Sequence, residues 1–199
     1  MKFRYPFESD EARKLNRIVF ECIYYAALSQ STRLCREEWQ RAVAQCRETG
    51  YYSTIQYLDA QSNYLEETVS YTDPNSIPQT IGAYASMQWN GCAPIFNGIF
   101  HWELAGLTET DLSNMFDWHT LRNHIKTYGV KNSLLIAIMP TATTSQFLGN
   151  NECIEPFTKN LYKRKTVAGE FIIGNKYLTN DLYNLKLYNQ DFSDYLIML

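Results

Sequence analysis

The sequence has no apolar run long enough to span a membrane, and its first residues, MKFRYPFESDE, lack the apolar core of a secretory signal. It also has no excess of basic residues. The net charge is −3 and the isoelectric point is near 5.6, unlike that of a protein with a nucleic-acid footprint. We find no internal repeat and no low-complexity tract. These absences favour a cytoplasmic setting, in the host's cytoplasm if the chain is viral.

The pattern of cysteines and histidines lacks the spacings of metal sites and disulfide frameworks. The five cysteines, at positions 22, 35, 46, 92 and 153, form no CxxC pair and no zinc spacing, and their number is odd. The three histidines, at positions 101, 119 and 124, lack the HExxH arrangement of a metal-binding helix. We therefore expect free thiols, core or surface histidines and no bound metal.

Two helices are expected to form much of the core, and 199 residues with 45% hydrophobic content can bury one. Ser9 can cap the first helix, and Asp117 or a neighbour can open the second, which Gly129 ends. The expected buried stripe of the first helix is Leu15, Ile18, Val19, Cys22, Ile23 and Ala26. The second helix carries Trp118, Leu121, Ile125 and Tyr128 on one side.

Strand and turn signals are shorter. The apolar run at 133–139 suits a buried strand, although its periodicity does not separate a strand from a buried helical turn. Residues 98–104, GIFHWEL, are strand-like in their aromatic and β-branched content. Asp-Pro-Asn-Ser at 73–76 predicts a turn or loop, and a polar loop or helix begins at 108–111.

The most informative stretch is 132–155, NSLLIAIMPTATTSQFLGNNECIE. Pro140 ends its apolar run, and a loop of small and hydroxyl-bearing residues follows, here called the hydroxyl loop: Thr141, Ala142, Thr143 and Thr144. If Thr144 or Ser145 opens a helix, the first N–H groups of that helix lack partners, and a phosphate would satisfy them at the positive end of the helix dipole. The alternative is a loop that only caps the helix.

Several motifs in a fixed order carry a family resemblance. They are RYPFES at 4–9, IYYAAL at 23–28, GAY at 82–84 with Gly91, Pro94 and Gly98, the stretch 117–155, NNECIEP at 150–156 and AGEF at 168–171. In this order they resemble the large, catalytic subunit of class I ribonucleotide reductase. The resemblance implies an α/β fold, as an incomplete segment of the family's ten-stranded α/β barrel. It also implies one partial barrel domain over 1–199, with an insertion at about 36–81 where the resemblance fades.

The resemblance also assigns the hydroxyl loop a ligand. In the family the equivalent loop holds the diphosphate of a ribonucleoside diphosphate, which implies that role for Thr141, Ala142, Thr143 and Thr144. Fixing the diphosphate would position the ribose and lower the entropic part of the barrier. The implied function is a part of the large subunit that reduces ribonucleoside diphosphates to deoxyribonucleoside diphosphates for DNA synthesis.

The family's radical-bearing and redox cysteines, relay tyrosines and effector regions have no counterpart here. We therefore expect no catalytic residue in the chain and no activity of the chain alone. The resemblance implies a dimetal radical cofactor in a small radical-generating subunit, ATP and dNTP effectors bound elsewhere, and the remaining large-subunit fragments as partners. The alternative is a non-catalytic remnant or interaction protein derived from that subunit.

Three further groups have a functional and a structural interpretation. The adjacent Tyr24 and Tyr25 could transfer a radical, but we assign them to packing in the first helix. The basic run at 163–165 could bind phosphate or act as a targeting patch, but Glu152, Glu155 and Glu170 flank it, so we expect a solvated face. Cys153, near the hydroxyl loop, is expected to be structural, and so is Cys92, where the family often has Ser.

Overall fold

The computed structural model describes residues 5–60, 63–88, 94–167, 169–189, 191–192 and 194–195. The chain divides into two compact units, Met1–Ala137 and Ile138–Leu199, and each is described by itself. Some residues named in the sequence analysis lie outside the described residues, namely Arg4, Gly91, Cys92 and Ala168.

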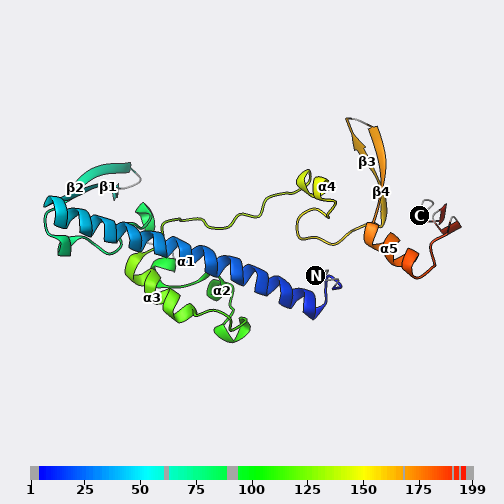
Figure 1. The fold of residues 1–199 in the computed structure, drawn as a ribbon, viewed down its shortest axis with the longest axis horizontal. Coiled ribbons are helices and arrows are strands. Elements are labelled where there is room, and N and C mark those ends of the chain that lie inside the picture. Colours follow the sequence, from blue (N-terminus) through cyan, green and yellow to red (C-terminus); the bar gives the residue numbers. More distant parts are fainter. Residues whose placement is uncertain are drawn as a thin grey trace. The chain divides into compact units, whose positions relative to one another are not determined.

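The first unit is built on α1 (Asp10–Thr49), the long blue-to-cyan helix of Figure 1. The predicted cap is confirmed, because the Ser9 hydroxyl accepts a hydrogen bond from Ala12 N at 3.2 Å. Gly50 ends the helix at φ 82, a conformation that residues with a Cβ seldom adopt.

The predicted buried stripe of α1 is wrong. Val19 and Ile23 are each 44% exposed, and Cys22 and Ala26 are also exposed. The buried residues of α1 are instead Glu21, Leu28, Ser31, Thr32, Cys35, Ala42 and Cys46. Many of these are small or polar, and they let other segments approach closely: a Cβ on Gly82 would lie 2.8 Å from Cys35 Cα. Close packing partners, rather than the most apolar face, decide which side of α1 is buried.

The core of the first unit lies between α1, α2 (His101–Leu104) and α3 (Trp118–Tyr128), and Figure 1 shows α2 and α3 along one side of α1. As predicted, Asp117 caps α3 by accepting from Thr120 N at 2.8 Å, and Gly129 ends it at φ 77. The central cluster consists of Leu28, Met87, Phe100, Trp118, Leu121, Ile125 and Val130. The predicted apolar face of α3 is therefore confirmed, and its other predicted member, Tyr128, is half-buried.

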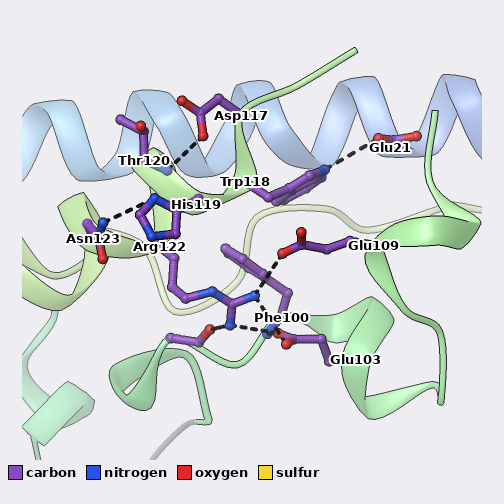
Figure 2. Close-up of polar contacts among 11 residues, drawn as sticks. Glu21, Phe100, Glu103, Glu109, Asp117, Trp118, His119, Thr120, Arg122 and Asn123 are labelled. Atoms are coloured by element: carbon purple, nitrogen blue, oxygen red, sulfur yellow. Dashed lines mark hydrogen bonds and ion pairs between the residues drawn. The ribbon is translucent and has the colours of Figure 1, made fainter. Parts of the chain in front are cut away.

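A buried carboxylate joins α1 to this core. Glu21 is 7% exposed and accepts hydrogen bonds from Ser113 N at 2.9 Å and Trp118 Nε1 at 3.4 Å. A buried carboxylate needs such donors, since burying an unpartnered charge is costly. Glu21 thereby connects α1 to the start of α3 and to the loop that precedes it (Figure 2).

A second polar network centres on Arg122 of α3. Its guanidinium donates to both carboxylate oxygens of Glu103 at 3.1 Å and to the Gly98 carbonyl. It also lies 3.7 Å from the Glu109 carboxylate and 4.7 Å above the Phe100 ring. Figure 2 shows the guanidinium between these groups, so one side chain connects α3 to α2 and to the turn before it.

Near the end of α1, β1 (Tyr52–Ala60) and β2 (Asn63–Tyr71) form a two-stranded antiparallel sheet with Tyr52 opposite Tyr71. The predicted turn at 73–76 is confirmed as η1 (Pro74–Ser76), which Asp73 caps. A second cluster seats this region on α1 through Ala42, Cys46 and Ile77, with Trp39, Val43, Tyr52, Tyr71 and Ile81 around them. That 36–81 is an insertion relative to the family stays a prediction.

Two predicted strands are wrong. Residues 98–104 instead contain α2, and its N-cap residue Phe100 donates through its backbone N to the Glu103 carboxylate at 2.7 Å. Residues 133–139 form no strand, and Leu134 and Met139 are 89% and 63% exposed. A strand must pair its backbone N–H and C=O groups with a neighbouring strand. No strand within the described ranges pairs with 133–139.

Short 3₁₀ turns connect these elements: η2 (Ala85–Gln88), η3 (Pro94–Asn97) and η4 (Glu109–Asp111). The last confirms the polar loop or helix predicted at 108–111, and Thr108 precedes it.

The second unit contains α4 (Thr144–Leu148), a hairpin of β3 (Leu161–Thr166) and β4 (Gly169–Gly174), and α5 (Lys176–Asn184). The hairpin is antiparallel, with Arg164 opposite Phe171. The chain is thus mixed helix and strand, and its described part contains two separate two-stranded sheets but no closed barrel. No helix in the described ranges is long and apolar enough to cross a membrane.

Candidate functional site

The hydroxyl loop leads directly into a helix, as predicted. Thr144 is the first residue of α4, which runs through Leu148 and ends at Gly149 with φ 62. Ser145 N donates to the Thr141 carbonyl at 2.9 Å, and this bond closes the loop into a turn. With five residues, α4 aligns few peptide dipoles, so donors of the loop itself matter more than a helix dipole.

The donors of the loop differ in availability. Ala142, Thr143 and Thr144 are exposed and Thr141 is half-buried. In the part of the chain that the structure describes, no hydrogen bond occupies the Thr143 or Thr144 hydroxyl. Thr141 Oγ1 accepts from Cys153 N at 2.7 Å, which leaves its O–H free to donate. The loop therefore presents hydroxyl donors to solvent while Thr141 anchors it.

A cation from the basic run that was expected to form a solvated face lies against this loop. Arg164 Nη2 donates to the Ala142 carbonyl at 3.5 Å and lies 3.2 Å from Glu152 Oε1. The Arg164 side chain is 28% exposed, so the expected solvated face is wrong for this residue. It is confirmed for Lys163 and Lys165, which are 73% and 85% exposed. The sequence signal that could have identified Arg164 is the alternation of side chains in a strand, which places Arg164 on the face opposite Lys163 and Lys165.

Lys176 is a second cation near the end of α4. Its ammonium donates to the Gly149 carbonyl and lies 5.1 Å from the centre of the Tyr177 ring. Lys176 begins α5, whose cap is Asn175, so the position of this charge is set by a helix start. One cation, from β3, thus contacts the loop, and a second, from α5, contacts the residue that ends α4.

The tyrosine pair of α1 packs against the core, as predicted. Tyr24 stacks on His101 with ring centroids 5.2 Å apart, and Tyr25 stacks on Phe116 at 4.6 Å. Tyr24 also lines a cavity of about 170 Å³ with mostly aliphatic walls. Burial raises the pKa of Tyr24, although its hydrogen bond with the backbone of His101 opposes this.

The cysteines within the described residues are free thiols, as predicted: Cys22, Cys35, Cys46 and Cys153. Burial raises the pKa of Cys35 to about 12, which keeps it a thiol at neutral pH. Cys153 is exposed and contacts the hydroxyl loop through its backbone N–H. No three His, Cys, Asp or Glu side chains within the described ranges come together in a way that could hold a metal ion.

Comparisons with known proteins match this chain over nearly its whole length. The family described as "Ribonucleotide reductase, barrel domain" matches residues 1–198. The ribonucleoside-diphosphate reductase large subunit of Acanthamoeba polyphaga mimivirus is 37% identical over 192 residues, which are 96% of this chain and 17% of that protein.

Two further relatives are named ribonucleoside-diphosphate reductase large chain. The protein of Neurospora crassa is 36% identical over 99% of this chain and 16% of its own length, and that of Encephalitozoon cuniculi is 38% identical over 98% and 19%. The chain thus spans less than a fifth of the length of these relatives. Because the family match covers residues 1–198, the chain belongs to the ribonucleotide reductase barrel-domain family.

Proposed function

We propose that this chain supplies the substrate diphosphate-binding loop of a ribonucleoside-diphosphate reductase large subunit. Thr141, Ala142, Thr143 and Thr144 would hold the diphosphate of a ribonucleoside diphosphate. The observation that carries the proposal is the exposed loop whose Thr143 and Thr144 hydroxyls have no partner among the described residues. Family membership supplies the ligand class, since relatives carry the name of that reductase.

The chemistry of the loop suits a multiply charged anion. Hydroxyl and amide donors form short, strong hydrogen bonds to charged oxygens. Arg164 adds positive charge beside the loop, although Glu152 balances part of it, and Lys176 adds a second charge at the C-terminal end of α4. In the complete enzyme, fixing the diphosphate would position the ribose for reduction.

The remaining parts of the reaction belong to other segments and to a second subunit. We propose that the chain acts as a segment of a ten-stranded α/β barrel that the remaining large-subunit segments complete. The exposed apolar side chains of Leu134, Ile136, Ile138 and Met139 support this, since such surface is normally covered. A small subunit would carry the dimetal radical cofactor, and ATP and dNTP effectors would bind outside this chain. Reduction would then serve DNA synthesis, in the cytoplasm.

The binding role is tested by replacing Thr143 and Thr144 together with Val in the assembled enzyme. Valine keeps the branched shape and removes two hydroxyl donors. Each hydrogen bond to a charged group contributes about 1.5–3 kcal/mol, so affinity for a ribonucleoside diphosphate should fall about a hundredfold or more. Equilibrium binding measures this.

Thr127→Val is the matched control, because its hydroxyl already donates to the Asn123 carbonyl at 2.8 Å on α3. It should leave affinity unchanged, and so should Tyr24→Phe. Equal affinity of the double variant and the parent would show that the hydroxyls do not hold the diphosphate.

Activity separates the proposal from the non-catalytic alternative. The chain with only a small subunit and reductant should form no deoxyribonucleoside diphosphate. Adding the missing large-subunit segments should restore turnover. If correctly folded segments restore none, the chain is a remnant or an interaction protein, and if the chain is active without them, the assignment of the radical chemistry to other segments is wrong.

A further inference from the structure

Glu152 and Cys153, which are adjacent in the sequence, are connected to the adjacent loop residues Ala142 and Thr141. Cys153 N–H donates to Thr141 Oγ1, and Glu152 pairs with the guanidinium that donates to the Ala142 carbonyl. That guanidinium belongs to Arg164, so the first half of the loop is tied to the 152–153 segment both directly and through a bridge. Ala142 offers no polar side chain, and its carbonyl accepts from Arg164 Nη2 at 3.5 Å and from Ser145 Oγ at 3.4 Å, so Arg164 is the partner that comes from outside the loop and α4.

Arg164 is presented by a paired strand rather than by a loop. It lies in β3 opposite Phe171 of β4, with pairs on both sides of it in the register. Side chains of adjacent strand residues point to opposite faces, so Lys163 and Lys165 face away from Arg164. Those lysines lie 3.7 and 3.9 Å from the Glu170 carboxylate. The hairpin thus separates two solvated lysines from one arginine that reaches the loop.

We propose that Arg164 is a positioning residue for the hydroxyl loop. It holds the Ala142 carbonyl and keeps the loop in the shape in which the Thr143 and Thr144 donors are free to meet a diphosphate. A loop that becomes ordered only when it binds loses conformational entropy, which weakens its affinity for the ligand. A loop that is already ordered in the free protein does not lose this entropy on binding. The identity of the ligand rests on the proposed function.

The charge of Arg164 is not its main contribution, since Glu152 lies 3.2 Å from the same nitrogen that contacts the loop. The pair places little net charge beside the diphosphate. What arginine supplies is a planar group with donors in fixed directions, which lysine lacks. Positioning and simple attraction of the anion therefore predict different results for Arg164→Lys and Glu152→Gln.

The test is amide hydrogen exchange on the full chain at low concentration, with and without inorganic pyrophosphate. The reporters are Ser145 N, bonded to the Thr141 carbonyl, and Cys153 N, bonded to Thr141 Oγ1. In Arg164→Met and Arg164→Lys, both amides should exchange several-fold faster without ligand. The pyrophosphate concentration for half-maximal protection should rise about tenfold, as expected when one hydrogen bond with a charged partner is lost. Glu152→Gln should act in the same direction with a smaller effect.

Lys163→Met is the matched control, because it removes the same charge from the same strand but not the loop contact. It should change neither measurement by more than about twofold, as expected for an exposed ion pair. Exchange in α5 should stay at the parent's rate in every variant, which excludes general unfolding of the second unit.

Other outcomes would refute either the positioning role of Arg164 or the diphosphate-binding role of the loop. Unchanged exchange at Ser145 and Cys153 in Arg164→Met would overturn positioning. Parent-like behaviour of Arg164→Lys, or tighter pyrophosphate binding by Glu152→Gln, would also overturn it and leave charge as the only contribution. If the parent shows no protection by pyrophosphate, the proposed diphosphate role of the loop fails, while exchange without ligand still decides the role of Arg164.

Discussion

Replacing Arg122 with Met should destabilise the first unit through one polar network. Methionine keeps a flexible apolar stem that can still cover the Phe100 ring, so the change removes mainly the guanidinium. Both hydrogen bonds to Glu103, the contact with the Gly98 carbonyl and the weaker pairing with Glu109 would be lost. Within the described ranges, the Glu103 carboxylate would then keep one hydrogen bond, from Phe100 N.

The magnitude follows from how far the pair is shielded from water. The Arg122 and Glu103 side chains are 21% and 29% exposed. Breaking a fully buried pair costs about 3–5 kcal/mol, and exposed pairs contribute about 0–1 kcal/mol. A partly buried, bidentate pair lies between these limits, and we expect a loss of about 2 kcal/mol. With a typical dependence on denaturant, the unfolding midpoint should fall by about 1 M urea.

Tryptophan fluorescence during urea unfolding reports on the first unit, which contains Arg122. Three of the four tryptophans, Trp39, Trp102 and Trp118, lie in the described part of the first unit. Arg33→Met is the control, since Arg33 lies 3.5 Å from Glu37 with side chains 61% and 45% exposed. It should change stability by less than about 0.5 kcal/mol. If Arg122→Met is no more destabilising than this control, the network does not stabilise the unit and the reasoning from burial is wrong.

Two further predictions concern titratable groups. Burial raises the pKa of Glu103, but the hydrogen bonds from Phe100 N and Arg122 lower it by a larger amount. The net pKa therefore lies below the ordinary value of 4.5. Its stabilisation is therefore present above about pH 4.5 and is lost as the pH falls through the lowered folded-state pKa, so urea midpoints should drop as the pH falls below about 4.5. Glu103→Gln should reduce that drop, and an identical pH dependence would contradict the assignment. With its pKa raised to about 12 by burial, Cys35 should resist a thiol reagent at about pH 8 that labels the exposed Cys153. Site-resolved mass spectrometry of the folded chain measures this, and equally fast labelling would show that Cys35 is not protected.

Local interactions account for what the sequence by itself determined. The helix from Asp117 to Gly129, with its cap, apolar face and glycine stop, was predictable because each signal acts within a few residues of the backbone it orders. The same holds for the Ser9 cap and for α4 starting at Thr144. The hydroxyl loop and the family also follow from residue order alone.

Only the tertiary structure decided which surfaces are covered and which distant groups meet. The buried side of α1 follows from its contacts rather than from its most apolar residues, and 133–139 lacks a described partner strand despite its strand-like composition. The contact between Arg164 and Ala142 joins residues 22 positions apart. Side-chain periodicity defines the faces of a helix or strand, but the partner of each face depends on long-range packing, which no local pattern encodes.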